Sequence, residues 1–281
     1  MDISLLRAPD GAFSLADIDP GATPGFDGGK AAGKDELSAV VAELTDLQER
    51  LFAEGRTRPD ARRVLLVLQG MDTSGKGGTV RKVIGSLDPQ GVAIASFGTP
   101  TPEELEHDFL WRVHSQLPTP GRIGVFDRSH YEDVLIARVR SLVPAEEVDR
   151  RYAAIRDFEA DLVADGVRIV KVMLHISPEE QRDRLLARLD EPAKHWKFSP
   201  ADIDDRALWA DYQAAYERAI AETHRPGTPW YVVPAESKWY RNLAVAHLLL
   251  AELRALDLQW PTASFDPAEQ RRRLVEEDPL S

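Results

Sequence analysis

Residues 64–79 read Val-Leu-Leu-Val-Leu-Gln-Gly-Met-Asp-Thr-Ser-Gly-Lys-Gly-Gly-Thr, an apolar run that leads into a glycine-rich loop with one lysine. The run from Val64 to Leu68 has the length of a buried strand in a parallel sheet. Glycines let the following loop turn tightly, so that its backbone N–H groups point inward at an anion. The stretch therefore predicts a phosphate-binding loop, whose glycines are Gly70, Gly75, Gly77 and Gly78.

A helix is expected directly after this loop, from Thr79 to Ile84. The N-terminus of a helix adds partial positive charge beside a bound phosphate. Lys76 supplies a full charge where the phosphates undergoing transfer would lie. The loop residues that we predict to bind phosphate are Gly75, Lys76, Gly77, Gly78 and Thr79.

The loop departs from the common pattern Gly-x-x-x-x-Gly-Lys-[Ser/Thr] at one position. Gly77 stands where a hydroxyl would hold magnesium. Asp72 lies inside the loop, where a carboxylate repels phosphate unless a cation lies between them. Because Mg²⁺ prefers carboxylate and phosphate oxygens, we predict that Asp72 is the substitute metal ligand. The alternative is that Asp72 only caps the following turn.

Composition limits the class of protein. The 281 residues are 43% hydrophobic and include no cysteine, which allows one large α/β core and excludes disulfides. The net charge of −12 argues against a nucleic-acid partner, because nucleic-acid binders are usually basic. No apolar stretch is near the ~18 residues of a membrane span, and residues 1–33 lack the basic-then-apolar pattern of a secretory signal. We therefore expect a cytoplasmic protein with no membrane partner.

The spacing of apolar residues predicts strands that alternate with helices. Such alternation implies an α/β fold, with a five-stranded parallel sheet and helices on both faces. Ligands then bind at the carboxyl ends of the strands. Strands are expected at 64–68, 92–97, 123–126, 167–176 and 230–233, and helices around 37–51, 79–84, 105–117, 148–162, 179–189, 208–219 and 243–253.

Three parts of the chain differ in character. Residues 1–34 are rich in Gly, Asp, Pro and Ala and are predicted to be a flexible, partly disordered N-terminal segment. Residues 35–258 are expected to form a single domain, and residues 259–281 a C-terminal tail.

A second signal is the stretch Ile123-Gly-Val-Phe-Asp-Arg-Ser129. An apolar strand that ends in Asp127 is the usual partner of a phosphate loop, because its carboxylate reaches the magnesium from an adjacent strand. Arg128 follows at once and can bind a phosphate through two parallel hydrogen bonds. The alternative is that Asp127 caps a helix that begins near His130.

A third signal is the basic stretch from Gln181 to Lys197. In an enzyme of phosphoryl transfer, mobile basic residues can close over the phosphates and offset developing charge. The alternative is a solvated helix face, since acidic residues in the same stretch could pair with these bases. The candidate phosphate-binding residues are Arg184, Arg188, Lys194 and Lys197.

Other residue types give weaker signals. The seven histidines show no metal-binding spacing. His130 lies beside Asp127 and could touch a substrate; the alternative is a packing or capping role. Ser74 and Ser129 have no evident base partner, and the pattern Gly-x-Ser-x-Gly is absent, so hydrolysis by a serine nucleophile is not supported.

Together these stretches resemble the polyphosphate kinase type 2 family over roughly residues 35–258. The resembling segments, in chain order, are Gly70–Thr79, Asp88–Gly91, Phe126–Asp133, Lys194–Ser199 and Trp239–Asn242. The family's loop typically carries Asp at the place of Asp72, which accounts for the missing hydroxyl.

The resemblance implies a P-loop kinase-like sheet with a helical lid, here about residues 182–222. It implies transfer of phosphate between inorganic polyphosphate and nucleotides with Mg²⁺, with Mn²⁺ as a second candidate, and self-association into a homo-oligomer. By position, Asp72 and Asp127 match the metal ligands, and Lys76, Arg128 and Arg188 match the cationic residues that handle the phosphates. Together with Asp127, these three are the expected catalytic residues. Lys194 and Lys197 match lid positions.

The sequence His130-Tyr-Glu-Asp133 resembles the branch of the family that uses nucleoside monophosphates as well as diphosphates. We therefore place His130 and Glu132 on the acceptor side. The alternative is that Glu132 and Asp133 are only first-turn residues of a helix, where the helix dipole favours acidic side chains. Two readings compete with a polyphosphate enzyme: an ATP-dependent kinase of the same fold, and a nucleotide-binding regulatory module without turnover. The complete set of Lys76, Asp127 and Arg128 argues against the second, because binding alone needs no transfer site.

Overall fold

The computed structural model of the protein describes residues 1–277 and residue 280. In this part of the chain, helices and strands alternate as expected. The strands are β1 (Arg63–Gln69), β2 (Val92–Ser96), β3 (Ile123–Asp127), β4 (Val167–His175) and β5 (Trp230–Pro234). The helices are α1 (Lys30–Thr57), α2 (Lys76–Lys82), α3 (Pro102–Leu105), α4 (Trp111–His114), α5 (Glu132–Val139), α6 (Ala145–Ala164), α7 (Pro178–Leu189), α8 (Ala201–Ala207), α9 (Trp209–Thr223), α10 (Lys238–Ala255) and α11 (Pro267–Glu276).

The strands of the described residues form one sheet in the order β2-β3-β1-β4-β5, and every pairing is parallel. This confirms the predicted five-stranded parallel sheet. Leu68 of β1 pairs with Asp127 of β3, so the phosphate loop and the Asp127-Arg128 pair leave the sheet side by side. The two main sequence signals are thus brought to one edge by strand register alone.

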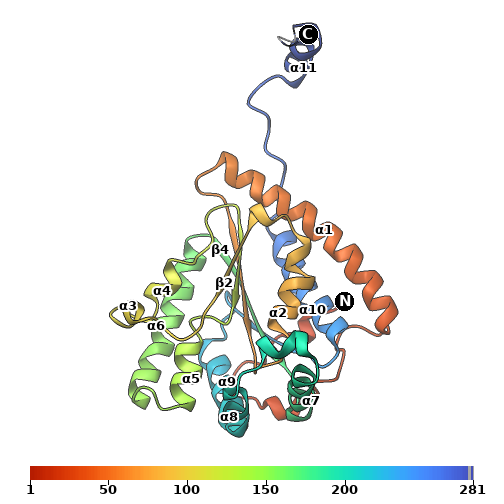
Figure 1. The fold of residues 1–281 in the computed structure, drawn as a ribbon. Helices are drawn as coiled ribbons and strands as arrows, with labels where there is room; N and C mark the ends of the chain where they lie inside the picture. The colour runs from red at the N-terminus through yellow and green to blue at the C-terminus, as the bar shows by residue number, and fades with distance from the viewer. Residues whose placement is uncertain (278–279, 281) are drawn as a thin grey trace.

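Helices cover both faces of the sheet (Figure 1). Alternate residues of β1 serve opposite faces: Leu66 packs with residues of α1 and α10, whereas Val67 packs with residues of α5, α6 and α9. This is the two-residue period of a strand, with apolar residues at every position because both faces are buried.

Helices α7 and α8 lie at the carboxyl end of the sheet, close to the start of α2 (Figure 1). They belong to the predicted lid, together with the 3₁₀ helix η5 (Pro192–Lys197) and α9. None of the helices in the described residues combines the length and apolar character that a membrane span needs.

The structure corrects two expectations about local order. The apolar residues between 105 and 117 do not form one helix but two short ones, α3 and α4. The Asp108 carboxylate accepts from the backbone N–H of Leu110 at 3.0 Å, which turns the chain between them. Leu105 is 71% exposed, so the helical spacing of the apolar residues from 105 to 117 does not mark one buried helix face.

The N-terminal segment also differs from the composition-based expectation of disorder. Leu6 and Leu15 are buried, and the Ala8 N–H donates to the Trp230 carbonyl at 2.9 Å. Arg7 forms an antiparallel bridge to Tyr231, so the segment protects the edge strand β5. A few apolar anchors therefore hold a segment whose composition is otherwise typical of a flexible one.

The described C-terminal residues extend away from the sheet and its helices (Figure 1). Helix α11 stands apart from the rest of the molecule in Figure 1, and its Leu274 and Val275 are each 70% exposed.

Candidate active site

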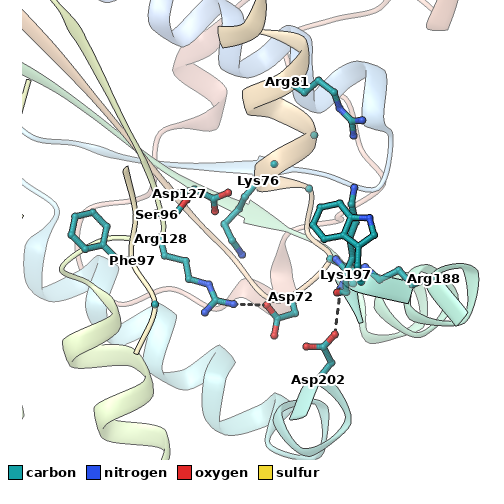
Figure 2. A pocket seen from close by; sticks show the side chains of 16 residues that line it. Asp72, Lys76, Arg81, Ser96, Phe97, Asp127, Arg128, Arg188, Lys197 and Asp202 are labelled. Atoms are coloured by element: carbon teal, nitrogen blue, oxygen red, sulfur yellow. Dashed lines mark hydrogen bonds and ion pairs between the residues drawn. The ribbon is translucent and has the colours of Figure 1, made fainter. Parts of the chain in front are cut away.

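A cavity of about 760 Å³ opens at the carboxyl end of the sheet (Figure 2). The phosphate loop and the start of α2 form one wall, the ends of β2 and β3 a second, and the lid a third. The lining residues are Asp72, Thr73, Gly75, Lys76, Gly77, Gly78, Arg81, Ser96, Phe97, Gly98, Asp127, Arg128, Arg188, Trp196, Lys197 and Asp202.

The loop has the backbone shape that anion binding requires. Gly75 has φ +113°, a left-handed conformation that favours glycine, and it is the residue that precedes helix α2. The helix therefore begins at Lys76, earlier than the expected Thr79, and the first-turn N–H groups belong to loop residues. Thr79 itself is fully buried beneath the cavity. Free first-turn N–H groups are the donors that bind phosphate at helix N-termini.

Lys76 is buried within this wall. Its ammonium donates to the carbonyls of Gly70 at 2.7 Å and Met71 at 3.3 Å, which fixes it in the curve of the loop. Burial lowers the pKa of Lys76, against the opposing effect of Asp72. An anion bound in the loop would relieve that desolvation cost.

Asp127 ends β3 and faces the start of α2. A Cβ built on Gly77 would lie 4.0 Å from its Oδ2, so the glycine leaves open space beside this carboxylate. A serine or threonine at this position would partly fill that space. The Asp127 carboxylate thus faces the position of the hydroxyl that the sequence lacks.

Arg128 and Asp72 form an ion pair across the cavity, with Nη2 to Oδ1 at 2.9 Å (Figure 2). Burial lowers the pKa of Arg128, but the charges of Glu132 and Asp72 outweigh this effect and raise it. Arg128 has φ 64° and the loop residue Thr73 has φ 66°, a region that side chains rarely adopt. Such strain is concentrated at functional sites in proteins.

The lid contributes part of its basic stretch to the cavity. Arg188 donates to the Lys197 carbonyl at 2.8 Å and pairs with Asp202 at 3.3 Å (Figure 2). The Lys197 ammonium lies 4.9 Å from the ring centroid of Trp196, which is 79% exposed. These side chains therefore face the phosphate loop from the opposite wall, as the sequence predicted for Arg188 and Lys197.

Three predicted phosphate-binding residues do not line the cavity: the buried Thr79 of α2, and Arg184 and Lys194 of the lid. The Arg184 guanidinium donates to the carbonyls of Thr73, Ser74, Ala235 and Glu236, so it braces the loop from outside. Lys194 pairs with Glu191 on the lid surface. Both sit in the expected basic stretch, but helix geometry turns them away from the cavity.

His130 does not lie on the acceptor side, where the family resemblance had placed it. It is 1% exposed, and its Nε2 lies 3.4 Å from Oε1 of the buried Glu159. The Ser129 hydroxyl accepts from Gln69 and from the N–H of Tyr131, which holds the turn so that His130 points inward. It packs in the interior and does not face an acceptor.

Glu132 and Asp133 point in different directions. Asp133 pairs with Arg112 at 2.9 Å, away from the phosphate loop. Glu132 lines a small second cavity of about 40 Å³ together with Asp72, Arg128 and Tyr216. Burial raises the pKa of Glu132, and Arg128 and Lys76 oppose this effect. Only Glu132 of this pair is therefore placed to influence an acceptor.

Sequence reasoning missed several residues that the fold gathers here. Arg81 follows the loop by one helical turn, and Phe97 follows β2, a position that could have been inferred from strand order. Asp202 and Trp196 come from the lid. Arg241 of α10 lies against the loop glycines; it occurs in one of the segments that carry the family resemblance, but no signal marked its role.

The parallel sheet, the phosphate loop and the facing acidic and basic residues define a phosphate-loop transferase of the kinase type. The family model of Polyphosphate kinase 2 (PPK2) matches residues 28–260. The chain belongs to this family.

Known relatives agree with this assignment. The chain is 50% identical over 253 residues to the AMP/ADP-polyphosphate phosphotransferase of Meiothermus ruber, covering 90% of this chain and 93% of that protein. It is 43% identical over 250 residues to the ADP-polyphosphate phosphotransferase of Rhodopseudomonas palustris, covering 85% and 84%. The crystal structure of polyphosphate kinase 2 from Arthrobacter aurescens TC1 is similar with a TM-score of 0.93 and 55% identity, over 97% and 95% of the two chains.

Proposed function

We propose that this protein transfers a phosphoryl group between inorganic polyphosphate and a nucleoside mono- or diphosphate, making ADP, ATP or GTP. The observation that carries the proposal is the arrangement of Lys76, Asp127 and Arg128 in one cavity that Arg188 and Lys197 face from the lid. The names of the relatives from Meiothermus ruber and Rhodopseudomonas palustris support this substrate pair.

The arrangement suits a reaction that needs no strong general base. The attacking oxygen belongs to a nucleotide phosphate, which is already deprotonated near neutral pH. Catalysis then depends on alignment of the two phosphates and on neutralisation of charge as the phosphoryl group moves. The first-turn N–H groups of α2 and Lys76 bind the donor phosphates, and Arg128 and Arg188 offset charge from two sides.

The residues present fit a bound Mg²⁺. Asp72 and Asp127 both line the cavity, and the hydrogen bond between Asp72 and Arg128 is made by Oδ1, not by Oδ2. No group of three or more acidic or histidine side chains in that part of the chain could hold a metal. Mg²⁺ nevertheless commonly needs only one or two carboxylates, with phosphate oxygens and water completing its shell. When bound, the ion would shield the phosphates from one another and from these carboxylates.

An assay of donor and acceptor tests the function directly. The protein would be incubated with ADP, AMP or GDP, polyphosphate and Mg²⁺, and the nucleotide products would be followed. Nucleotide phosphorylation that requires polyphosphate is expected. Transfer from ATP with none from polyphosphate would identify an ATP-dependent kinase, and binding without turnover would identify a regulatory module.

The lid contacts predict a contrast between two lysines of η5. Lys197→Ala should raise the polyphosphate KM about tenfold, because hydrogen bonds to charged groups contribute roughly 1.5–3 kcal/mol. Lys194→Ala should change it less than twofold, since Lys194 pairs with Glu191 outside the cavity. Arg188→Ala should impair polyphosphate use at least as much as Lys197→Ala. Equal, small effects in all three variants would show that the stretch is an ordinary solvated face.

The acceptor side gives a separate prediction: both AMP and ADP are phosphorylated, and Glu132 affects the choice. A carboxylate beside Arg128 repels additional acceptor phosphate, so Glu132→Gln should shift the ratio of kcat/KM for ADP over AMP upward by several-fold. Asp133, which pairs with Arg112, is a poor control because its loss would leave that arginine unpaired. Glu103→Gln, on the exposed helix α3, is the matched control. An unchanged ratio would assign selection to other residues, and no reaction with AMP would reject the monophosphate branch.

We also propose that the protein acts in the cytoplasm, where nucleotides are available, and that it self-associates. The second proposal rests only on the family resemblance. Cell fractionation and sedimentation velocity test the two proposals.

A further inference from the structure

Arg241 is a buried cation directly behind the phosphate loop. It lies in the first turn of α10, after β5, and is 4% exposed. It does not line the cavity, because the loop backbone stands between its guanidinium and the cavity.

The loop glycines and this guanidinium fit one another closely. A Cβ on Gly75 would lie 1.9 Å from Nη1 of Arg241, and a Cβ on Gly78 would lie 3.0 Å from Nη2. A side chain at position 75 would displace the guanidinium, and at φ +113° it would also strain the backbone. Gly75 and Gly78 therefore let a positive charge approach within one backbone layer of the space where a phosphate would bind.

The charge of Arg241 is not balanced within the described part of the protein. No carboxylate there lies within ion-pair distance of its guanidinium. Its side-chain donors Nε and Nη2 reach only the Asn242 Oδ1 atom, at 3.3 and 2.9 Å. Burial, together with a smaller effect of the nearby charge of Arg184, lowers the pKa of Arg241 to about 10. The guanidinium thus stays protonated at neutral pH, in an environment that disfavours its charge.

A buried charge without an opposite charge is costly, and proteins usually pair it. Arg184 differs, because it bonds four carbonyls and pairs with Glu180 at 2.6 Å. For Arg241, the anion that completes the balance would be the phosphate on the other side of Gly75 and Gly78. Electrostatic attraction through this dry layer is weakly screened by water and salt.

We propose that Arg241 is a positioning residue for the donor phosphate chain, acting through the backbone of Gly75 and Gly78 to hold polyphosphate in the loop. The proposal rests on the proposed function for the identity of the donor. The competing reading is that Arg241 is only a spacer that supports the loop.

The two readings differ in what the positive charge does. Arg241→Met keeps most of the apolar volume and removes the charge, whereas Arg241→Lys keeps the charge. Arg254→Met is the matched control, because it removes one positive charge from an exposed position on the same helix, where Arg254 pairs with Glu43. KM and kcat would be measured with polyphosphate varied at saturating ADP, and with ADP varied.

Arg241→Met is expected to raise the polyphosphate KM at least tenfold while changing the ADP KM less than twofold. Arg241→Lys should stay within about threefold of the natural protein, and Arg254→Met should not differ from it. Thermal unfolding adds a second readout, because a ligand that binds the native state raises Tm. Arg241→Met should keep its Tm without polyphosphate, since an unbalanced charge has been removed, but lose most of the rise on adding polyphosphate.

A spacer would behave differently. A lower Tm without ligand, an undiminished polyphosphate shift, or equal kinetic defects in Arg241→Met and Arg241→Lys would each overturn the proposal. If Arg241→Met does not fold, Arg241→Gln replaces it. If neither folds while Arg241→Lys does, the side chain is needed for folding and the proposal is rejected. If the natural protein uses ATP in place of polyphosphate, the proposed function fails, and the same variants with ATP varied still decide the role of Arg241.

Discussion

Asp127→Asn is expected to lower kcat at least about a hundredfold, the scale observed when a group that stabilises transition-state charge is removed. Asparagine has nearly the same shape, so the cavity and the end of β3 should persist. What is lost is the negative charge that faces Gly77 and the start of α2, which we assign to metal binding. Initial rates at saturating polyphosphate and ADP, measured over a range of Mg²⁺ concentration, provide the test. The Mg²⁺ concentration for half-maximal rate should also rise.

The control for this variant is Asp183→Asn. The Asp183 side chain is 66% exposed on α7 and pairs with Arg182 at 3.7 Å, outside the cavity, so its loss should leave both parameters unchanged. Asp72→Asn should resemble Asp127→Asn if Asp72 is also a metal ligand. Natural activity in Asp72→Asn would assign that residue to the Arg128 ion pair alone. Natural activity in Asp127→Asn would reject the site as we describe it.

Lys76→Met is expected to lower kcat by about a hundredfold to a thousandfold. The side chains have similar length, but methionine brings no charge into the curve of the loop. It also leaves the Gly70 carbonyl without its donor at 2.7 Å, a structural cost of about 1–3 kcal/mol. Both polyphosphate binding and turnover should suffer, because the loop then holds phosphate with N–H groups alone.

Two further variants distinguish damage to the loop from loss of charge. Lys76→Arg keeps the positive charge in the loop, and Lys82→Met removes a positive charge elsewhere on α2. Lys82 is an exposed residue at the end of α2, so its variant tests for a general effect of lost charge. Circular dichroism and Tm establish that each variant is folded. A folded Lys76→Met protein with more than a tenth of the natural kcat would show that Lys76 only supports the loop.

The sequence predicted the sheet well, because each strand is a mainly apolar run bounded by polar residues, glycine or proline. Val64–Leu68 was one residue short of β1 at each end, and Ile123–Phe126 differs from β3 by one residue. The single helix expected at 105–117 was wrong because apolar spacing does not reveal a turn such as the one in which the Asp108 carboxylate accepts from the Leu110 N–H. The expectation of a flexible N-terminal segment was wrong because composition does not reveal tertiary contacts. Leu6 and Leu15 are buried against elements more than 200 residues away in sequence.

The site was predicted where its residues follow strands. Lys76, Asp127 and Arg128 reach the cavity because parallel strands end at one edge, and this is a consequence of the fold class. Side chains on helices were predicted less well. Arg184 and Arg188 share a helix face, yet one braces the loop and the other lines the cavity.

The sequence by itself determined the fold class, the phosphate loop and the carboxylate on the neighbouring strand. These features depend on local periodicity, on glycine and on strand order, all of which are read along the chain. Only the tertiary structure decided that His130 is buried, that Glu132 and Asp133 separate, and that Arg241 lies behind Gly75. These placements depend on which distant surfaces meet and exclude water, and no local pattern encodes such contacts.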